Sequence, residues 1–80
     1  MTADQLKKGG NALIQELIPS ELTLHLMEMG FIPGKIIQLL HQAPLKGPIA
    51  FKLENSVIAL RQTEAQLIRV STDQEILCQK

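Results

Sequence analysis

The sequence is poor in aromatic residues and in cysteine, and it carries no excess of either charge. It has no tryptophan, no tyrosine and only two phenylalanines, Phe31 and Phe51. Apolar residues still make up 45% of the 80 residues, so a core built mainly from aliphatic side chains and methionine is expected. A chain of this length is expected to form one domain.

The balanced charge argues against a nucleic-acid partner. Lys plus Arg number 8 and Asp plus Glu number 8, which gives a formal net charge of zero. Proteins that bind nucleic acids usually carry a surplus of basic side chains, because these neutralise the phosphates. We therefore expect no nucleic-acid binding.

The single cysteine and the lack of long apolar runs bear on the compartment. Cys78 has no second cysteine with which to form an internal disulfide, which favours a reducing environment. No apolar run approaches the roughly 20 residues that cross a bilayer as a helix. Asp4 lies early in the chain, and no signal-peptide pattern follows it. These features predict a cytoplasmic protein that is not inserted into the membrane.

Glycine and proline divide the chain into short segments. Strands are predicted at residues 11–18, 35–43, 49–54, 57–61 and 67–70, a helix at 21–29 and a helical turn at 63–66. In the third strand, Ile49, Phe51 and Leu53 alternate with polar or small residues, as expected for one buried face. Asn55-Ser56 is predicted as a tight turn, because asparagine tolerates positive φ. Five short strands favour a small β-barrel with an inserted helix.

The stretch LMEMGFIPGK, residues 26–35, joins the predicted helix to the second strand. Gly30 is suited to cap the helix in a left-handed conformation, and Pro33-Gly34 is suited to a tight turn. Phe31 and Ile32 are expected to plug the end of the barrel. A phosphate-binding loop runs in the opposite order, from a strand through glycines into a helix. The order of elements therefore excludes a phosphate site here.

One group of side chains is a candidate metal site. His25 follows Glu21 by four residues and precedes Glu28 by three, and these spacings bring side chains to one face of a helix. A histidine between carboxylates can hold a divalent ion. A solvated polar face is the favoured interpretation, with weak divalent metal binding as the alternative and no cofactor expected.

Catalysis is not expected. Nothing in the arrangement of serines, histidines and carboxylates resembles a nucleophile with a base and an orienting group. A chain of 80 residues also has little room for a deep pocket. The sequence therefore predicts a protein that is not an enzyme.

The predicted helix carries more apolar surface than one contact requires. Leu22, Leu26 and Met29 share one stripe. Leu24 and Met27 share a second stripe, about 160° away. A helix that packs on a barrel needs a single apolar arc. A wide buried face is the favoured interpretation, and the alternative is that Leu24 and Met27 form a patch for docking or self-association.

The segment APLKGP, residues 43–48, is a predicted loop with an apolar residue at its tip. Pro44 and Pro48 restrict the loop on either side of Leu45, and a pre-ordered loop loses less entropy on binding. Leu45 and Lys46 are therefore candidate partner-binding residues. Alternatively the loop folds back over the end of the barrel, and the sequence leaves both interpretations open.

These blocks, in this order, resemble the FeoA family. The matching blocks are Met29-Gly30-Phe31-Ile32-Pro33-Gly34, Ala43-Pro44-Leu45 with Pro48, Ile58-Ala59-Leu60-Arg61, and Ala65 with Ile68 and Val70. Gly30, Pro33, Gly34, Pro44, Pro48 and Arg61 are the motif positions that we single out. The likeness covers about residues 6 to 70, and Asn55 departs from the glycine that the family often has.

The resemblance implies a mainly β fold, an SH3-like β-barrel with inserted helices. It implies one FeoA-like domain over residues 1–80, with its core at about 6–70. The polar end, residues 71–80, is predicted as a loosely held tail. The resemblance also implies a small cytoplasmic accessory protein of bacterial ferrous iron uptake that binds FeoB, a membrane permease with a GTPase domain. The alternative is an SH3-like peptide-binding or regulatory module with a different partner, such as a metal-dependent regulator.

Overall fold

The structure, a computed structural model, describes residues 1–72. Its elements are η1 (Ala3–Gln5), β1 (Asn11–Leu17), α1 (Thr23–Glu28), β2 (Ile36–Gln42), β3 (Ile49–Leu53), β4 (Ser56–Leu60), α2 (Gln62–Ala65) and β5 (Ile68–Thr72). All five predicted strands and both predicted helical segments are present. β5 continues through Thr72, so the predicted tail begins too early, and its remainder, with Cys78, lies outside the described residues. No helix within residues 1–72 has the length and apolar character needed to cross a membrane.

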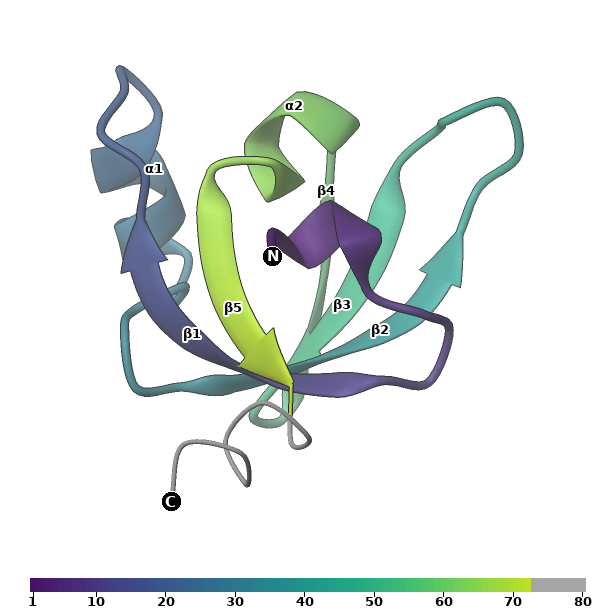
Figure 1. The fold of residues 1–80 in the computed structure, drawn as a ribbon. Coiled ribbons are helices and arrows are strands. Elements are labelled where there is room, and N and C mark those ends of the chain that lie inside the picture. The colour runs from purple at the N-terminus through teal and green to yellow at the C-terminus, as the bar shows by residue number, and fades with distance from the viewer. Residues whose placement is uncertain (73–80) are drawn as a thin grey trace.

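The five strands form one antiparallel sheet in the order β4-β3-β2-β1-β5. Figure 1 shows that this sheet is strongly curved. The register shifts between Ile14 and Glu16 in β1, and again between Leu39 and His41 in β2. Such bulges bend a strand and increase its twist. They explain how five short strands curl into the small barrel that the sequence predicts, and the predicted fold class is confirmed.

In the part of the chain that the structure describes, the barrel is not closed by pairing of its two edge strands; the helical segments η1 and α2 lie at its open side instead. Within residues 1–72, β4 and β5 are the two edges of the sheet and are not paired with each other. η1 contacts α2 and β5, and Figure 1 shows it lying over the hollow side of the sheet. Ala3 and Ala65 are both 0% exposed. The core therefore begins at Ala3, earlier than predicted, because three residues are too few to show a helical periodicity.

The two aromatic rings pack against each other in the core. Phe31 and Phe51 are 0% exposed, with their ring centroids 6.3 Å apart and their planes at 82°. An edge-to-face pair contributes about 0.5–1.5 kcal/mol beyond the burial of its area. The alternation predicted for β3 is confirmed, since Ile49 and Leu53 are buried beside Phe51.

The end of α1 is closed by the predicted glycine cap. Gly30 has φ +106°, a conformation that side-chain-bearing residues adopt only with strain. The Gly30 N–H donates to the carbonyl oxygen of Met27 at 3.0 Å, and the Phe31 N–H donates to that of Leu26 at 3.1 Å. These two bonds define a Schellman motif. Its apolar contact comes from Leu26 and Phe31, which are both fully buried.

A second tight turn follows at once and joins the helix end to the sheet. The Lys35 N–H donates to the Ile32 carbonyl oxygen at 3.1 Å, across Pro33 and a Gly34 with φ +95°, which fits a type II turn. The Gly34 N–H then donates to the Ile14 carbonyl oxygen in β1, at 2.8 Å. Ile32 is 40% exposed, so the prediction that it plugs the barrel is wrong, whereas Phe31 does enter the core.

The β3–β4 hairpin turns one residue earlier than predicted. Leu53 pairs with Ser56, which leaves Glu54 and Asn55 as the two turn residues. The positive φ, 56°, falls on Glu54 and not on Asn55. The Glu54 carboxylate forms an ion pair with the Lys35 ammonium group, so this hairpin is tied to the turn that follows α1.

Alanine substitutions at Gly30 and Gly34 separate two costs: the strain of a positive φ, and the steric clash of an added Cβ with its neighbours. Gly34→Ala is expected to lose about 1–2 kcal/mol of unfolding free energy from the positive φ alone, because nothing lies within 4 Å of its added Cβ. Gly30→Ala is expected to lose at least about 1 kcal/mol more, because its Cβ would lie 2.9 Å from Leu53 Cδ2. Urea unfolding of both variants measures the difference, and equal losses would contradict the role given to Leu53.

Candidate docking surface

The second apolar stripe of α1 faces solvent. Leu26 is 0% exposed, whereas Leu24 is 68% exposed and Met27 is 41% exposed. Leu22, at the start of the helix, is 38% exposed. A wide buried face was the favoured prediction and is wrong, because a helix of six residues offers only one face to the core. We call Leu24 and Met27 the α1 patch.

The predicted metal-binding trio is not assembled. Glu21 precedes the first helical residue, Thr23, so its spacing of four from His25 does not place the two side chains on one helix face. Glu28 is the last residue of α1. Within residues 1–72, no three His, Cys, Asp or Glu side chains come close enough to hold a metal ion. His25 and Glu28 are three residues apart within α1, so this pair still shares a helix face.

The APLKGP loop projects Leu45 into solvent. Leu45 is 99% exposed, so the interpretation in which the loop folds back over the barrel is wrong. Leu45 and Lys46 have φ values of 61° and 56°. The loop is closed at its base, where the Ala43 N–H donates to the Pro48 carbonyl oxygen at 2.9 Å. Two consecutive left-handed residues without glycine are strained, and such strain concentrates at functional sites.

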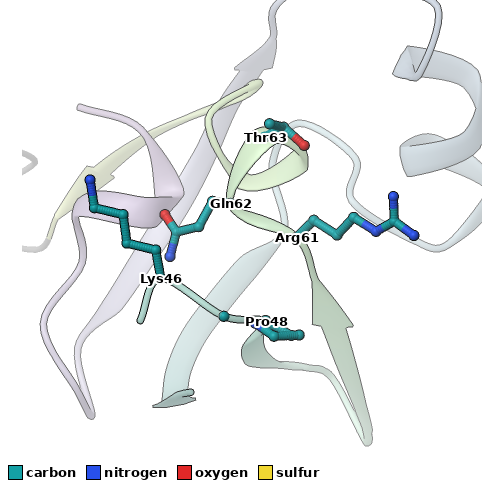
Figure 2. A pocket seen from close by; sticks show the side chains of 6 residues that line it. Lys46, Pro48, Arg61, Gln62 and Thr63 are labelled. Atoms are coloured by element: carbon teal, nitrogen blue, oxygen red, sulfur yellow. The ribbon is translucent and has the colours of Figure 1, made fainter. Parts of the chain in front are cut away.

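A hollow lies between this loop and the start of α2. It is lined by Lys46, Gly47, Pro48, Arg61, Gln62 and Thr63, and its volume is about 510 Å³. Figure 2 shows the Lys46 and Arg61 side chains extending away from each other, with Gln62 between them. We call this feature the loop–α2 hollow. It places Lys46 and Pro48 of the predicted loop beside Arg61, which follows β4.

Gln62 and Thr63 were not predicted as part of a site. Their only signal in the sequence is that they follow Arg61 directly. The Arg61 N–H donates to Glu64 Oε1 at 2.8 Å, and this contact holds the first turn of α2 in place. Gln62 Nε2 is buried and has no hydrogen-bond partner. Such an unpaired donor is uncommon in folded proteins and calls for an explanation.

The charges of the loop–α2 hollow are not neutralised by the chain itself. The ion pairs found within residues 1–72 join Lys35 to Glu54 and Arg69 to Glu16. Lys46 and Arg61 take part in neither pair. In Figure 1, α1 and the loop between β2 and β3 lie on opposite sides of the molecule, so the α1 patch and the hollow are separate surfaces.

The chain matches a known protein family over most of its length. The FeoA domain model matches residues 1–72. The chain belongs to the FeoA family. A Campylobacter jejuni protein named "Putative Fe(2+) transport protein A" is 35% identical over 72 residues, which are 89% of this chain and 97% of that protein. The resemblance inferred from the motif blocks is thereby confirmed.

Solved structures share the fold. The solution structure of iron(II) transport protein A from Clostridium thermocellum has a TM-score of 0.85 and 40% identity. The match covers 92% of this chain and 46% of that one, so this chain spans just under half of that protein. Stenotrophomonas maltophilia FeoA in complex with zinc, described as an SH3 domain protein, has a TM-score of 0.79 and 22% identity, with 89% of each chain covered. The predicted SH3-like class is confirmed.

The backbone strain at Leu45 can be measured by replacing this residue with glycine, which adopts a positive φ without strain. Leu45→Gly is expected to raise the free energy of unfolding by about 1 kcal/mol, because the side chain is 99% exposed and gives up no packing. Val57→Gly is the matched control: Val57 is 65% exposed but lies in β4. There glycine is expected to cost about 0.5–1 kcal/mol. Thermal and urea unfolding give both values, and a destabilised Leu45→Gly would contradict the strain.

Proposed function

We propose that this chain is a small cytoplasmic accessory protein of bacterial ferrous iron uptake, and that it acts by docking onto the cytoplasmic part of the FeoB permease. Membership of the FeoA family supports the transport role. The names of the Campylobacter and Clostridium relatives support it too, since both refer to iron(II) transport. Such a role requires binding and no bond-breaking chemistry, which accords with the prediction that the chain is not an enzyme.

The exposed face of α1 is the observation that carries the docking proposal. Leu24 and Met27 are three residues apart, so their side chains are neighbours on the helix surface. They are 68% and 41% exposed, although their neighbour Leu26 is completely buried. Exposed apolar residues that cluster are characteristic of interaction sites. Methionine also adapts its shape to a partner.

An amphipathic helix of this kind fits a recognised binding mode. A short helix can place its apolar face in a groove of a partner through residues at spacings of three and four. α1 is held at its end by the Schellman motif and at its core face by Leu26. Because the helix is already ordered, docking costs little additional conformational entropy.

The docking surface can be tested with two aspartates. Leu24→Asp combined with Met27→Asp is expected to change the unfolding free energy by no more than about 0.5 kcal/mol per site, as for exposed positions in general. It is expected to weaken binding to the purified cytoplasmic part of FeoB at least about tenfold, because two apolar contacts are replaced by charges. Calorimetric titration measures the affinity.

Ile36→Asp combined with Val57→Asp is the matched control. Ile36 is 58% exposed and Val57 is 65% exposed, and both lie on strands rather than on α1. This variant is expected to bind FeoB like the unmodified protein. Equal affinity of the α1 variant would rule out the patch. Normal ferrous uptake in a strain that lacks this chain would rule out the accessory role itself.

A further inference from the structure

We propose that the loop–α2 hollow binds an acidic, partly apolar segment of a protein partner. The inference rests on the proposed function in so far as that partner is FeoB. It concerns a surface distinct from the α1 patch, on the other side of the molecule. The hollow combines two diverging cations, a buried donor without a partner and a strained loop beside it.

The positive charge of the side chains that line the hollow favours a negatively charged ligand. Two lining residues, Lys46 and Arg61, are cations, and the residues that line the hollow with them carry no carboxylate. The protein as a whole has no net charge, so this local surplus does not follow from its composition. Charge complementarity between surfaces fixes the partner's identity and orientation. A ligand with negative charge is therefore expected.

The spread of the two cations favours an extended segment over a compact anion. In Figure 2 the Lys46 and Arg61 side chains point away from each other on either side of Gln62. A single phosphate is bound best by donors that converge on it. Two diverging cations instead match two carboxylates spaced along a peptide.

Polar groups between the cations can take up the peptide's own oxygens. Gln62 Nε2 is buried without a partner, and Thr63 lines the same hollow. A donor left unpaired in the free protein is satisfied if a bound segment presents an acceptor. Because that nitrogen is buried, small side-chain movements must accompany binding, and such movements are common at interfaces.

The loop supplies the apolar part of the recognition. Leu45 is 99% exposed and directly precedes Lys46. Both residues have positive φ, a strained backbone conformation of the kind that concentrates at functional sites. The Gly47 N–H donates to the carbonyl oxygens of Ala43 and Pro44, at 3.3 and 3.2 Å, and these bonds hold the loop. An apolar residue beside a carboxylate on the partner can therefore contact Leu45 while the carboxylate contacts Lys46.

The first test uses the cytoplasmic part of FeoB and charge reversal. Lys46→Glu combined with Arg61→Glu is expected to weaken binding at least about tenfold, and to reduce the loss of affinity that added salt causes. Lys8→Glu combined with Lys52→Glu is the matched control, because it changes the net charge equally at exposed residues outside the hollow. If the unmodified protein binds FeoB and both variants bind equally well, the hollow is not used.

The second test needs no FeoB, so it separates the failure of this inference from that of the proposed function. The probe is a synthetic eight-residue peptide of Asp, Glu and Leu, compared with a peptide in which Asn and Gln replace the acids. Nuclear magnetic resonance follows the side-chain signals of Gln62 and Arg61 in the full chain. Saturable shifts with the acidic peptide at about 1 mM or below, and none with its neutral counterpart, are expected.

Each remaining outcome is decisive. No shift with the acidic peptide overturns the inference, whatever FeoB does. Equal shifts with inorganic phosphate would make the hollow a free-anion site and would also overturn it. Gln62→Met separates ligand binding from structure, because methionine keeps the shape and removes the unpaired donor. This variant is expected to fold at least as stably and to bind the acidic peptide about threefold or more weakly; unchanged binding would exclude Gln62 from the site.

Discussion

The left-handed backbone of Gly30 is the constraint on which the rest of the fold depends. It ends α1 and lets Phe31 turn directly into the core, where its ring meets Phe51 edge to face. The turn that follows is hydrogen-bonded to Ile14, so the same short junction sets the start of β2 beside β1. The only two aromatic residues of the chain therefore meet here, Phe31 from the junction and Phe51 from β3. The direction of α1, and with it the exposed face that the α1 patch occupies, follows from this geometry.

Much of this fold could be predicted because its signals are local. The glycine cap at Gly30, the Pro33-Gly34 turn and the alternation along β3 each depend on a few neighbouring residues, and all three are present. η1 could not be predicted in this way, since the burial of Ala3 depends on α2 and β5, which are distant in sequence. The hairpin turn was misplaced by one residue for a similar reason. Its position is set by the pairing of Leu53 with Ser56, and this pairing overrides the preference of Asn55 for positive φ.

The candidate surfaces were predictable only in part. The two stripes of α1 are visible in the sequence, but which of them is buried depends on the angle at which the helix meets the barrel, and that angle is set beyond the helix. The sequence shows that Leu45 lies at a loop tip. Its exposure could not be predicted, because it depends on the hydrogen bond between Ala43 and Pro48 that closes the base of the loop. The loop–α2 hollow is a product of the tertiary structure, since Lys46 and Arg61 are 15 positions apart and are brought together by β3 and β4. Pairwise spacing arguments, such as the one that linked His25 to Glu21, fail where a helix starts two residues late.

The position of β5 in the sheet affects how the protein folds during its synthesis. Its neighbour is β1, and Ala12 pairs with Thr72 across 60 intervening steps of the chain. Contacts this distant in sequence slow folding, because a long loop must close before they form. A ribosome delivers β1 first and β5 last. Until Ile68 and Val70 emerge, one side of the core has no cover. The nascent chain must therefore keep an apolar surface exposed from the synthesis of β1 until β5 has emerged and paired with it.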